Sequence, residues 1–378
     1  MELELKNLYD DFRDADTIKA YAKMIALDAE KLEKPINIME VCGGHTHTIM
    51  KFGLPQILPK EIEFVHGPGC PVCIMPKERI DHAIELASMP NTILATLGDM
   101  IRVPGSKTSL QKLRAEGKDI RSLYTPLDVI KIAKENPEKI VVFFAIGFET
   151  TTPMTAVLLD QIIKEDIQNI YLHINHVTVP EAVDAIMGGG DAKIDAFLGP
   201  SHVSVITGYK IYEQIVEKYN TPVVVAGFEP TDVMESILRI VRQFNAGQER
   251  FVDNEYARAV SREGNVKAQE LINKYMEQRD HFRWRGIGDI PKSALKLRDE
   301  YAKYDAEIKF KDVLPTKELD DHKLCICGQI LKGLAKPYDC KVFGKACTPT
   351  SPMGSCMVSS EGACSAYFKY GKLVAKGV

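Results

Sequence analysis

The stretch IVVFFAIGFETTTP, residues 140–153, joins an apolar run to a glycine turn and the start of a helix. Ile140–Ile146 contains only apolar residues, which is the pattern of a strand buried on both faces of a parallel sheet. Three threonines ahead of Pro153 make a conventional helix start. The stretch therefore predicts a strand, a tight turn and a helix in succession, as in a βαβ unit.

The same order of strand and turn recurs along residues 1–250. Further strands are expected where short apolar runs end in a turn, at Ile36–Val41, Ile62–Val65, Ile93–Leu97, Ile170–Ile174, Ala196–Leu198 and Val223–Ala226. Helices are expected between several of these runs, at Lys77–Ala87, Leu127–Glu135, Met154–Lys164, Val179–Ile186, Tyr209–Tyr219 and Asp232–Phe244. Strands that alternate with helices predict the α/β fold class with parallel sheets.

We expect two Rossmann-like parallel-sheet βαβ domains, residues 1–135 and 136–250, followed by a region of different character at 251–378. That last region begins with a charge-rich segment expected to be helical, Asp253–Gln278. It continues through FRWRGIG at 282–288 into a tail rich in cysteine, glycine and proline. Because the tail shows little periodicity, we expect a small C-terminal domain organised around a metal, with an iron–sulfur cluster as the favoured occupant.

Several short motifs directly follow predicted strands. They are CGGHTH at 42–47, GPGCPVC at 67–73, GDM at 98–100, GFETTTP at 147–153, GPSHVS at 199–204 and GFEP at 227–230. In open parallel α/β sheets, ligands bind at the carboxyl ends of the strands. The motifs therefore predict a functional cleft at this edge.

Composition and motifs oppose several classes of function. A net charge of −4 argues against nucleic-acid binding, because such proteins usually carry a basic stripe. No window approaches the roughly 20 apolar residues of a membrane helix, and no phosphate loop or dinucleotide fingerprint occurs. The segment MELELKNLYDDFRDADT lacks the apolar core of a secretory signal, so we expect a cytoplasmic protein. Clustered thiols in that reducing compartment indicate metal binding or catalysis.

Six of the nine cysteines lie between Cys325 and Cys364, in the run C-x-C-x12-C-x6-C-x8-C-x7-C. Iron–sulfur clusters are held by four thiolates at uneven spacings. Structural zinc prefers paired C-x2-4-C knuckles, which the tail does not offer. A four-thiolate cluster with a redox-active pair would use all six cysteines, while zinc and unliganded thiols are the alternatives.

The other three cysteines occur in the motifs that follow strands. Cys42 precedes two glycines and His45, and a nearby imidazole or helix N-terminus could depress its pKa and favour the reactive thiolate. The alternative is a small buried apolar residue. Cys70 and Cys73 form a C-x-x-C pair, suited to a dithiol switch or to half of a zinc site. Glu149 either caps the following helix or binds a ligand.

Taken together, CGGHTH, GPGCPVC, GFETTTP, PSHVS, VVAGFEP and the tail segment CMVSSEGAC resemble the HypD family of hydrogenase maturation factors. The resemblance covers nearly the whole chain. It implies a redox-active scaffold on which the Fe(CN)2CO group of [NiFe] hydrogenases is assembled, with a HypC-like chaperone and a HypE-like cyanide donor. The group would then pass to the hydrogenase large subunit.

The resemblance also implies roles for individual residues. Cys42 matches the cysteine that holds the iron under assembly, and the Cys70–Cys73 dithiol would bind iron or supply electrons. A [4Fe-4S] cluster would be held by Cys327, Cys340, Cys347 and Cys364. Cys325 and Cys356 are left as a redox disulfide, although Cys325 could replace Cys327 as a ligand. His45 and Glu149 would orient the site or move protons.

Two other functions remain open from the residues alone. The chain could be an iron–sulfur thiol–disulfide oxidoreductase that acts on a protein partner through Cys70 and Cys73. It could instead be an interaction protein stabilised by zinc. Iron together with acid-labile sulfide would exclude the zinc alternative.

Overall fold

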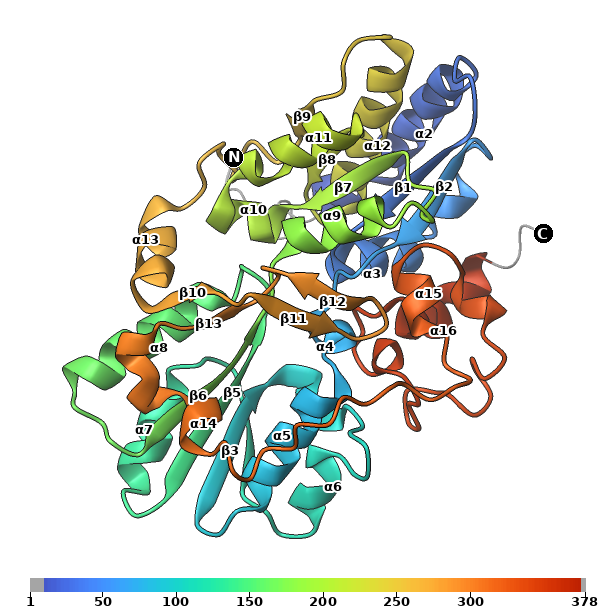
Figure 1. Ribbon diagram of the computed structural model, residues 1–378. Coiled ribbons are helices and arrows are strands. Elements are labelled where there is room, and N and C mark those ends of the chain that lie inside the picture. The colour runs from blue at the N-terminus through green and yellow to red at the C-terminus, as the bar shows by residue number, and fades with distance from the viewer. Residues whose placement is uncertain (1–9, 375–378) are drawn as a thin grey trace.

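The structure, a computed structural model, describes residues 10–374 of the 378-residue chain (Figure 1). Within that range, two parallel sheets have the strand orders β2-β1-β7-β8-β9 and β4-β3-β5-β6. Two antiparallel pairs, β10-β13 and β11-β12, accompany them. The predicted α/β class with two parallel sheets is confirmed.

The five-stranded sheet is built from two separate parts of the chain. Its strands are β1 (Ile36–Glu40), β2 (Ile62–His66), β7 (Ala196–Pro200), β8 (Val223–Ala226) and β9 (Val252–Asn254). The side chains of β7 and β8 are buried throughout, as expected for central strands of a sheet covered by helices on both faces.

The four-stranded sheet is formed by the residues between those two parts. Its strands are β3 (Thr92–Leu97), β4 (Ile120–Leu123), β5 (Ile140–Gly147) and β6 (Ile170–His176). The apolar run at 140–146 forms β5, which pairs with β3 on one side and β6 on the other. The strand predicted from its composition is therefore a central strand.

The division expected between residues 135 and 136 does not separate the two sheets. β3 and β4 precede it and β5 and β6 follow it, yet all four belong to one sheet. The chain enters the four-stranded sheet after β2 and returns after β6 to add β7 to the first sheet. The order of strands along the sequence did not predict this division, because a strand can pair within either sheet whatever its place in the sequence.

Helices cover both sheets and follow most of the strands. They are α2 (Ala15–Ala29), α3 (Gly43–Lys51), α4 (Pro71–Ile74), α5 (Lys77–Ser88), α6 (Leu110–Ala115), α7 (Asp128–Glu135), α8 (Thr152–Lys164), α9 (Val179–Gly188), α10 (Ser201–Thr207), α11 (Glu213–Tyr219), α12 (Pro230–Asn245), α13 (Val266–Tyr275), α14 (Ala306–Lys309), α15 (Cys327–Leu331) and α16 (Ala363–Val374). Proline at the first or second position of α4, α8, α9 and α12 fits the fixed backbone angle that a helix start requires.

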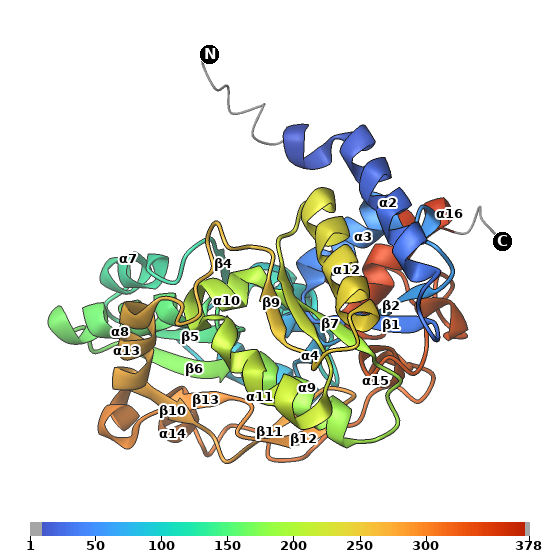
Figure 2. The ribbon, with the colours of Figure 1, turned by 90° about the horizontal axis from the view of Figure 1, so that it is seen from above.

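The segment expected to be one helix, Asp253–Gln278, is helical only in α13. Its first residues extend the five-stranded sheet as β9, and Met276–Gln278 forms β10 against β13 (Leu295–Leu297). The FRWRGIG motif forms a hairpin from β11 (His281–Trp284) and β12 (Gly288–Pro291). Figure 2 shows these antiparallel pairs along the side of the molecule opposite α2 and α12.

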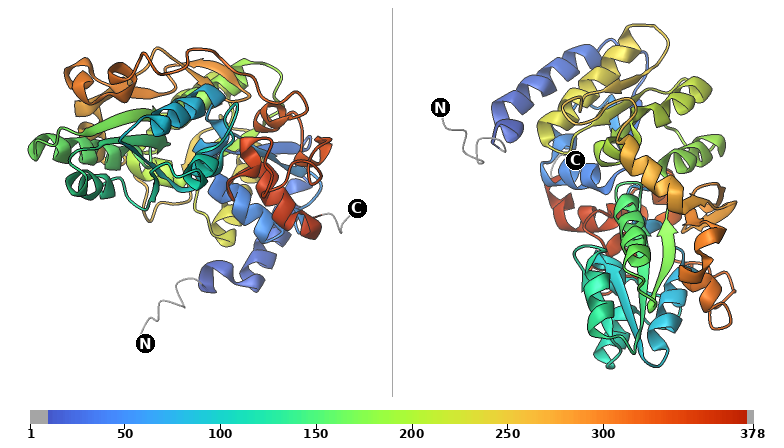
Figure 3. Two further views of the ribbon diagram at one scale, coloured as in Figure 1. Left: turned by 90° about the horizontal axis from the view of Figure 1, so that it is seen from below. Right: turned by 90° about the vertical axis from the view of Figure 1, so that its left-hand side faces the viewer.

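The carboxyl ends of the two sheets face each other, and the C-terminal tail lies beside their junction (Figures 1 and 3). One buried cluster joins Cys70 and Cys73 to Ile146 and Phe148 from the end of β5. α16 packs along α3, and the short turn Ser355–Met357 packs on α4. The cysteine-rich tail therefore covers the strand ends where the sequence motifs lie.

Candidate functional site

The motifs lie close together because they follow the carboxyl ends of strands, and each sheet has a reversal of strand order at that end. In the first sheet, β1 pairs with β2 on one side and β7 on the other. Such a reversal opens a crevice at the carboxyl ends of the strands, where α/β proteins bind ligands. Cys42 follows β1 at this point. The second sheet reverses between β3 and β5, and Glu149 follows β5.

Cys42 lies half-buried at the N-cap of α3. Its backbone N–H donates to Glu40 Oε2 at 3.2 Å, and a Cβ on Gly69 would overlap the Cys42 backbone. Burial, followed by the charges of Glu361 and Glu40, raises the pKa of the Cys42 thiol, and the helix N–H groups oppose this only in part. The suggestion that an imidazole or helix N-terminus depresses this pKa was wrong, because desolvation is the largest effect.

His45 is fully buried in the first turn of α3. Its Nε2 lies 3.1 Å from the carbonyl oxygen of Ala226 and 3.0 Å from that of Gly227, and its ring packs at a tilt against Phe228. Burial lowers the pKa of His45 to about 4, so the ring is neutral near pH 7. This geometry suits a residue that fixes α3 against the end of β8 better than one that moves protons.

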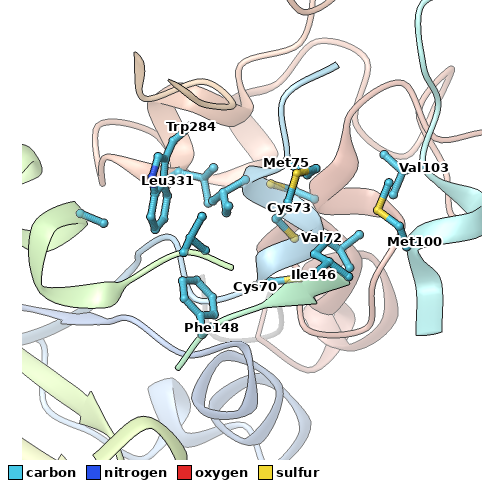
Figure 4. Close-up of a cluster of buried hydrophobic side chains, with 14 of the residues drawn as sticks. Cys70, Val72, Cys73, Met75, Met100, Val103, Ile146, Phe148, Trp284 and Leu331 are labelled. Carbon is cyan, nitrogen blue, oxygen red and sulfur yellow. The ribbon is translucent and has the colours of Figure 1, made fainter. Parts of the chain in front are cut away.

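Cys70 caps the N-terminus of α4 and Cys73 lies within this helix, and both belong to a cluster of buried side chains (Figure 4). Both are buried, and the Cys73 thiol is within hydrogen-bonding reach of the thiols of Cys70 and Cys356. Those contacts raise the pKa of Cys73 well above its ordinary value. Ser355 Oγ donates to the Cys73 carbonyl oxygen at 2.5 Å, which holds the tail against α4.

The tail continues this series of neighbouring thiols. The Sγ atoms of Cys325 and Cys327 lie 3.2 Å apart, and the Cys327 thiol is also within hydrogen-bonding reach of Cys356 and Cys364. Hydrogen bonds from Cys327 and Cys73 lower the pKa of Cys356 below its ordinary value. Adjacent thiols lead from Cys325 in the tail to Cys70 beside the sheets.

The four cysteines expected to hold a cluster gather in the same part of the tail. Cys364 contacts Cys327, and Cys347 is within electrostatic reach of Cys327. Cys340 Sγ lies 3.8 Å from the carbonyl oxygen of Leu324, which precedes Cys325. This donor set consists of soft thiolates, which fit an iron–sulfur cluster.

The expected disulfide is not formed in this structure. All nine cysteines lie in the described part of the chain, and each has a free thiol. Cys325 contacts Cys327, while Cys356 lies against Cys327 and Cys73. The pairing of Cys325 with Cys356 stays a prediction, as does the choice between Cys325 and Cys327 as a ligand.

Glu149 links the second sheet to the same region. Its Oε1 accepts the backbone N–H of Val179 at 2.8 Å, and its buried Oε2 has no hydrogen-bond partner within the part of the chain described. Burial raises the pKa of Glu149 to about 8. The side chain therefore caps α9 and keeps its proton near pH 7. The buried Tyr212 lies within electrostatic reach of both Glu149 and Cys42.

A cavity of about 500 Å³ opens beside the helix that Cys42 caps. One wall is α3, through Gly44, His47, Thr48 and Lys51, and another is the tail at Ser360 and Glu361. Phe228 lines the cavity between the rings of His45 and His202. The cavity reaches Gly44, two residues beyond the half-buried Cys42.

Comparison with known proteins agrees with this arrangement. The family described as "HypD: Hydrogenase formation hypA family" matches residues 16–371. The chain belongs to the HypD family. It is similar to "Hydrogenase maturation factor HypD2" of Bradyrhizobium diazoefficiens, with 50% identity over 96% of each chain. It is also 45% identical to "Hydrogenase maturation factor HypD" of Escherichia coli K12, over 89% of this chain and 90% of that protein.

Membership of the HypD family confirms the resemblance drawn from the motifs and supports a role in hydrogenase maturation. Clustered thiols are compatible with the metal or iron–sulfur binding expected of such a factor. Among the described residues, none of the helices has the length and apolar character needed to cross a membrane.

The sequence did not predict a buried hydrogen-bonded set near the HypD motifs, formed by Glu40, His66 and Tyr367. The buried Glu40 carboxylate accepts from the Cys42 N–H and the Thr46 hydroxyl, and it lies 2.7 Å from His66 Nδ1. His66 Nε2 in turn lies 3.0 Å from the Tyr367 hydroxyl on α16. A signal was present, because Glu40 and His66 occupy the ends of the two strands that precede the cysteine motifs.

A second group, His82, His173 and Glu307, has ligand atoms within 4.8 Å of one another. The hydrogen bonds and ion pairs of these three side chains explain why they lie close together, without a bound metal. Asn175 Nδ2 donates to His173 Nδ1 at 2.9 Å, so His173 Nε2 carries the proton and donates to His82 Nδ1 at 3.1 Å. Glu307 is neutralised by ion pairs with the guanidinium groups of Arg79 and Arg279. The group is a satisfied hydrogen-bond network.

Proposed function

We propose that this chain is a cytoplasmic scaffold on which the Fe(CN)2CO group of [NiFe] hydrogenases is assembled. A HypC-like chaperone and a HypE-like cyanide donor would work on it before the group passes to the hydrogenase large subunit. The observation that carries the proposal is the position of Cys42. This half-buried thiol follows β1, where the strand order of the five-stranded sheet reverses. The helix that it caps lines a cavity whose other wall includes the cysteine-rich tail.

Iron is the substrate in this proposal, and Cys42 is its first ligand. A thiol must lose its proton to bind a metal, so the raised pKa of Cys42 means that iron binding releases a proton. A thiolate of the HypC-like partner would reach the same iron through the cavity beside α3. Soft thiolates suit iron that carries cyanide and carbon monoxide.

The tail would hold a [4Fe-4S] cluster through Cys327, Cys340, Cys347 and Cys364. Such a cluster, when bound, exchanges single electrons. The remaining tail thiols, Cys325 and Cys356, would form the redox pair. The hydrogen-bonding contact between Cys356 and Cys73 supports communication with α4.

The thiol contacts favour an exchange step between the tail and α4. The Cys356 thiolate would attack Cys73 in a Cys70–Cys73 disulfide, forming a Cys356–Cys73 bond and releasing the Cys70 thiolate. A Cys325 thiolate would then attack Cys356 and release Cys73. Two electrons would thereby pass from the tail pair to the pair nearest the iron site, where Cys70 and Cys73 bind iron or supply electrons.

Anaerobic co-expression with HypC- and HypE-like partners tests the proposal. The scaffold should carry iron and acid-labile sulfide, and its infrared spectrum should show bands of metal-bound cyanide and carbon monoxide. Material that carries zinc without sulfide, and no such bands, would contradict the proposal.

The adjacent Cys70, Cys73 and Cys356 thiols also favour a second candidate, an iron–sulfur thiol–disulfide oxidoreductase that acts on a protein partner. That function predicts turnover of a disulfide substrate by Cys70 and Cys73 in protein without added iron. Turnover in the absence of the infrared bands would favour it over the scaffold.

A further inference from the structure

Arg285, in the FRWRGIG hairpin, is a buried cation beside the tail cysteines. Only 4% of the residue is exposed, which is unusual for a charged side chain. Burial opposes its charge, but Asp321 and then the Cys327 and Cys325 thiols outweigh this and raise the pKa of Arg285. The guanidinium is therefore within electrostatic reach of two adjacent sulfur atoms of the candidate cluster site.

The position of Arg285 is fixed by its backbone as well as its side chain. Its N–H donates to the carbonyl oxygen of Ile74 at 2.7 Å, which ties the hairpin to the end of α4. The next residue, Gly286, passes so close to Gly328 that a Cβ on Gly286 would lie 2.6 Å from the Gly328 Cα. Since Gly328 follows Cys327, the hairpin turn is packed directly against the cysteine segment.

Asp321, the acidic partner of Arg285, leaves part of the hydrogen-bonding capacity of the guanidinium unused. Nε donates to Asp321 Oδ1 at 2.7 Å, whereas the buried Nη1 has no hydrogen-bond partner within residues 10–374. An unpartnered buried donor is costly, and an anion nearby would remove that cost. A cluster held by thiolates carries negative charge, and accepting an electron makes that charge larger.

We propose that Arg285 is a positioning residue whose positive charge stabilises the reduced, more negative state of the iron–sulfur cluster that Cys327 would help to hold. The inference rests on the proposed iron–sulfur function and adds the residue that sets its reduction potential. A fixed cation raises the potential, because it stabilises the reduced state more than the oxidised state. Asp321, which also acts electrostatically on Cys325, moves the potential in the opposite direction.

The test compares Arg285→Gln, Arg285→Lys and Asp321→Asn in the full-length protein by redox titration followed by electron paramagnetic resonance. Arg285→Gln keeps an N–H donor and removes the charge, so the midpoint potential should fall. Arg285→Lys should retain most of the wild-type potential. Asp321→Asn leaves the guanidinium in place and removes the carboxylate charge, so the potential should rise. Iron and sulfide content are measured for each protein.

A purely structural role for Arg285 predicts no opposite shifts for the Arg285→Gln and Asp321→Asn variants. Equal potentials in wild type and all three variants would overturn the inference and leave the proposed function intact. Absence of iron and sulfide from the wild-type protein would overturn both. If Arg285→Gln alone fails to retain the cluster while Arg285→Lys retains it, the requirement for charge is supported. If both Arg285 variants lose it, the Asp321→Asn shift decides.

Discussion

The pKa of the Cys42 thiol is set by two opposing effects. Burial and the carboxylates of Glu361 and Glu40 favour the neutral thiol, and the N–H groups at the start of α3 favour the thiolate. A neutral resting thiol is a poor ligand until a metal displaces the proton. The resting Cys42 thiol is therefore neutral, and in the proposed scaffold it would become a ligand only when iron displaces its proton.

Substitution Glu361→Gln should make Cys42 more reactive, because it removes a negative charge that raises the Cys42 pKa. Burial raises the pKa of Glu361 itself, so the effect should be measured in alkaline buffer, where that carboxyl is charged. Each pKa unit regained should speed alkylation of Cys42 by up to about tenfold. The rate is measured by mass spectrometry of the Cys42 peptide.

Glu116→Gln, at an exposed position, is the matched control and should leave the Cys42 rate unchanged. An identical rate in wild type and Glu361→Gln would show that Glu361 does not control the thiol.

Close packing of two strand-to-helix turns positions Cys42 relative to Cys70. The turn after β2 carries Gly69, and the turn after β1 carries Cys42, with the Gly43 N–H donating to the Gly69 carbonyl oxygen at 2.9 Å. Because β1 and β2 are adjacent and parallel, both turns leave the sheet at the same level. The cysteines of two distant motifs are brought together in this way.

Gly69→Ala should destabilise this junction, because the new Cβ would overlap the Cys42 backbone and no side chain can rotate away. Overpacking of this kind costs about 1–3 kcal/mol in the free energy of unfolding. Urea denaturation measures the loss. Gly189→Ala, where the nearest atom to a Cβ lies at 3.5 Å, is the control and should unfold near the wild-type midpoint. Equal losses in the two variants would contradict the packing argument.

For the molecule as a whole, the sequence was most informative about elements and least about their partners. The buried run at 140–146 and the glycine and proline turns predicted most strands and their direction. They did not show that β7 returns to β1, because strand pairing depends on distant residues. Nor did they show Arg285 beside the cysteines, since a charged residue in a hairpin gives no local sign of burial.

The same limit applies within elements. The helical pattern over 253–278 was overridden at its ends by pairing of β9 with β8 and of β10 with β13. The thiol clusters, in contrast, were predictable because cysteine spacing and strand-end position carry their own chemical meaning. Which thiol touches which became apparent only after the tail was seen to fold over α3 and α4.

The stability of the whole protein should depend on pH through Glu149. Burial raises its pKa from 4.5 to about 8 in the folded protein. Between those values the folded state holds a proton that the unfolded state has lost, so stability falls as pH rises, by up to about 1.4 kcal/mol per unit. Glu149→Gln keeps the acceptor for Val179 N–H and cannot ionise. Between roughly pH 6 and pH 8, the urea midpoint should fall less in this variant than in wild type.

The exposed substitution Glu217→Gln provides the control for that experiment and should follow the wild-type pH dependence. A Glu149→Gln profile parallel to wild type would mean that the carboxyl is ionised in the folded protein.

The division of labour between Cys42 and the tail is tested most directly by Cys42→Ala, co-expressed with the HypC- and HypE-like partners. Infrared spectra and iron and sulfide analysis are collected on the same anaerobic sample. We predict unchanged iron and sulfide from the tail cluster, and loss of the bands of metal-bound cyanide and carbon monoxide. Bands of wild-type intensity in Cys42→Ala would contradict the assignment of Cys42 as the iron ligand.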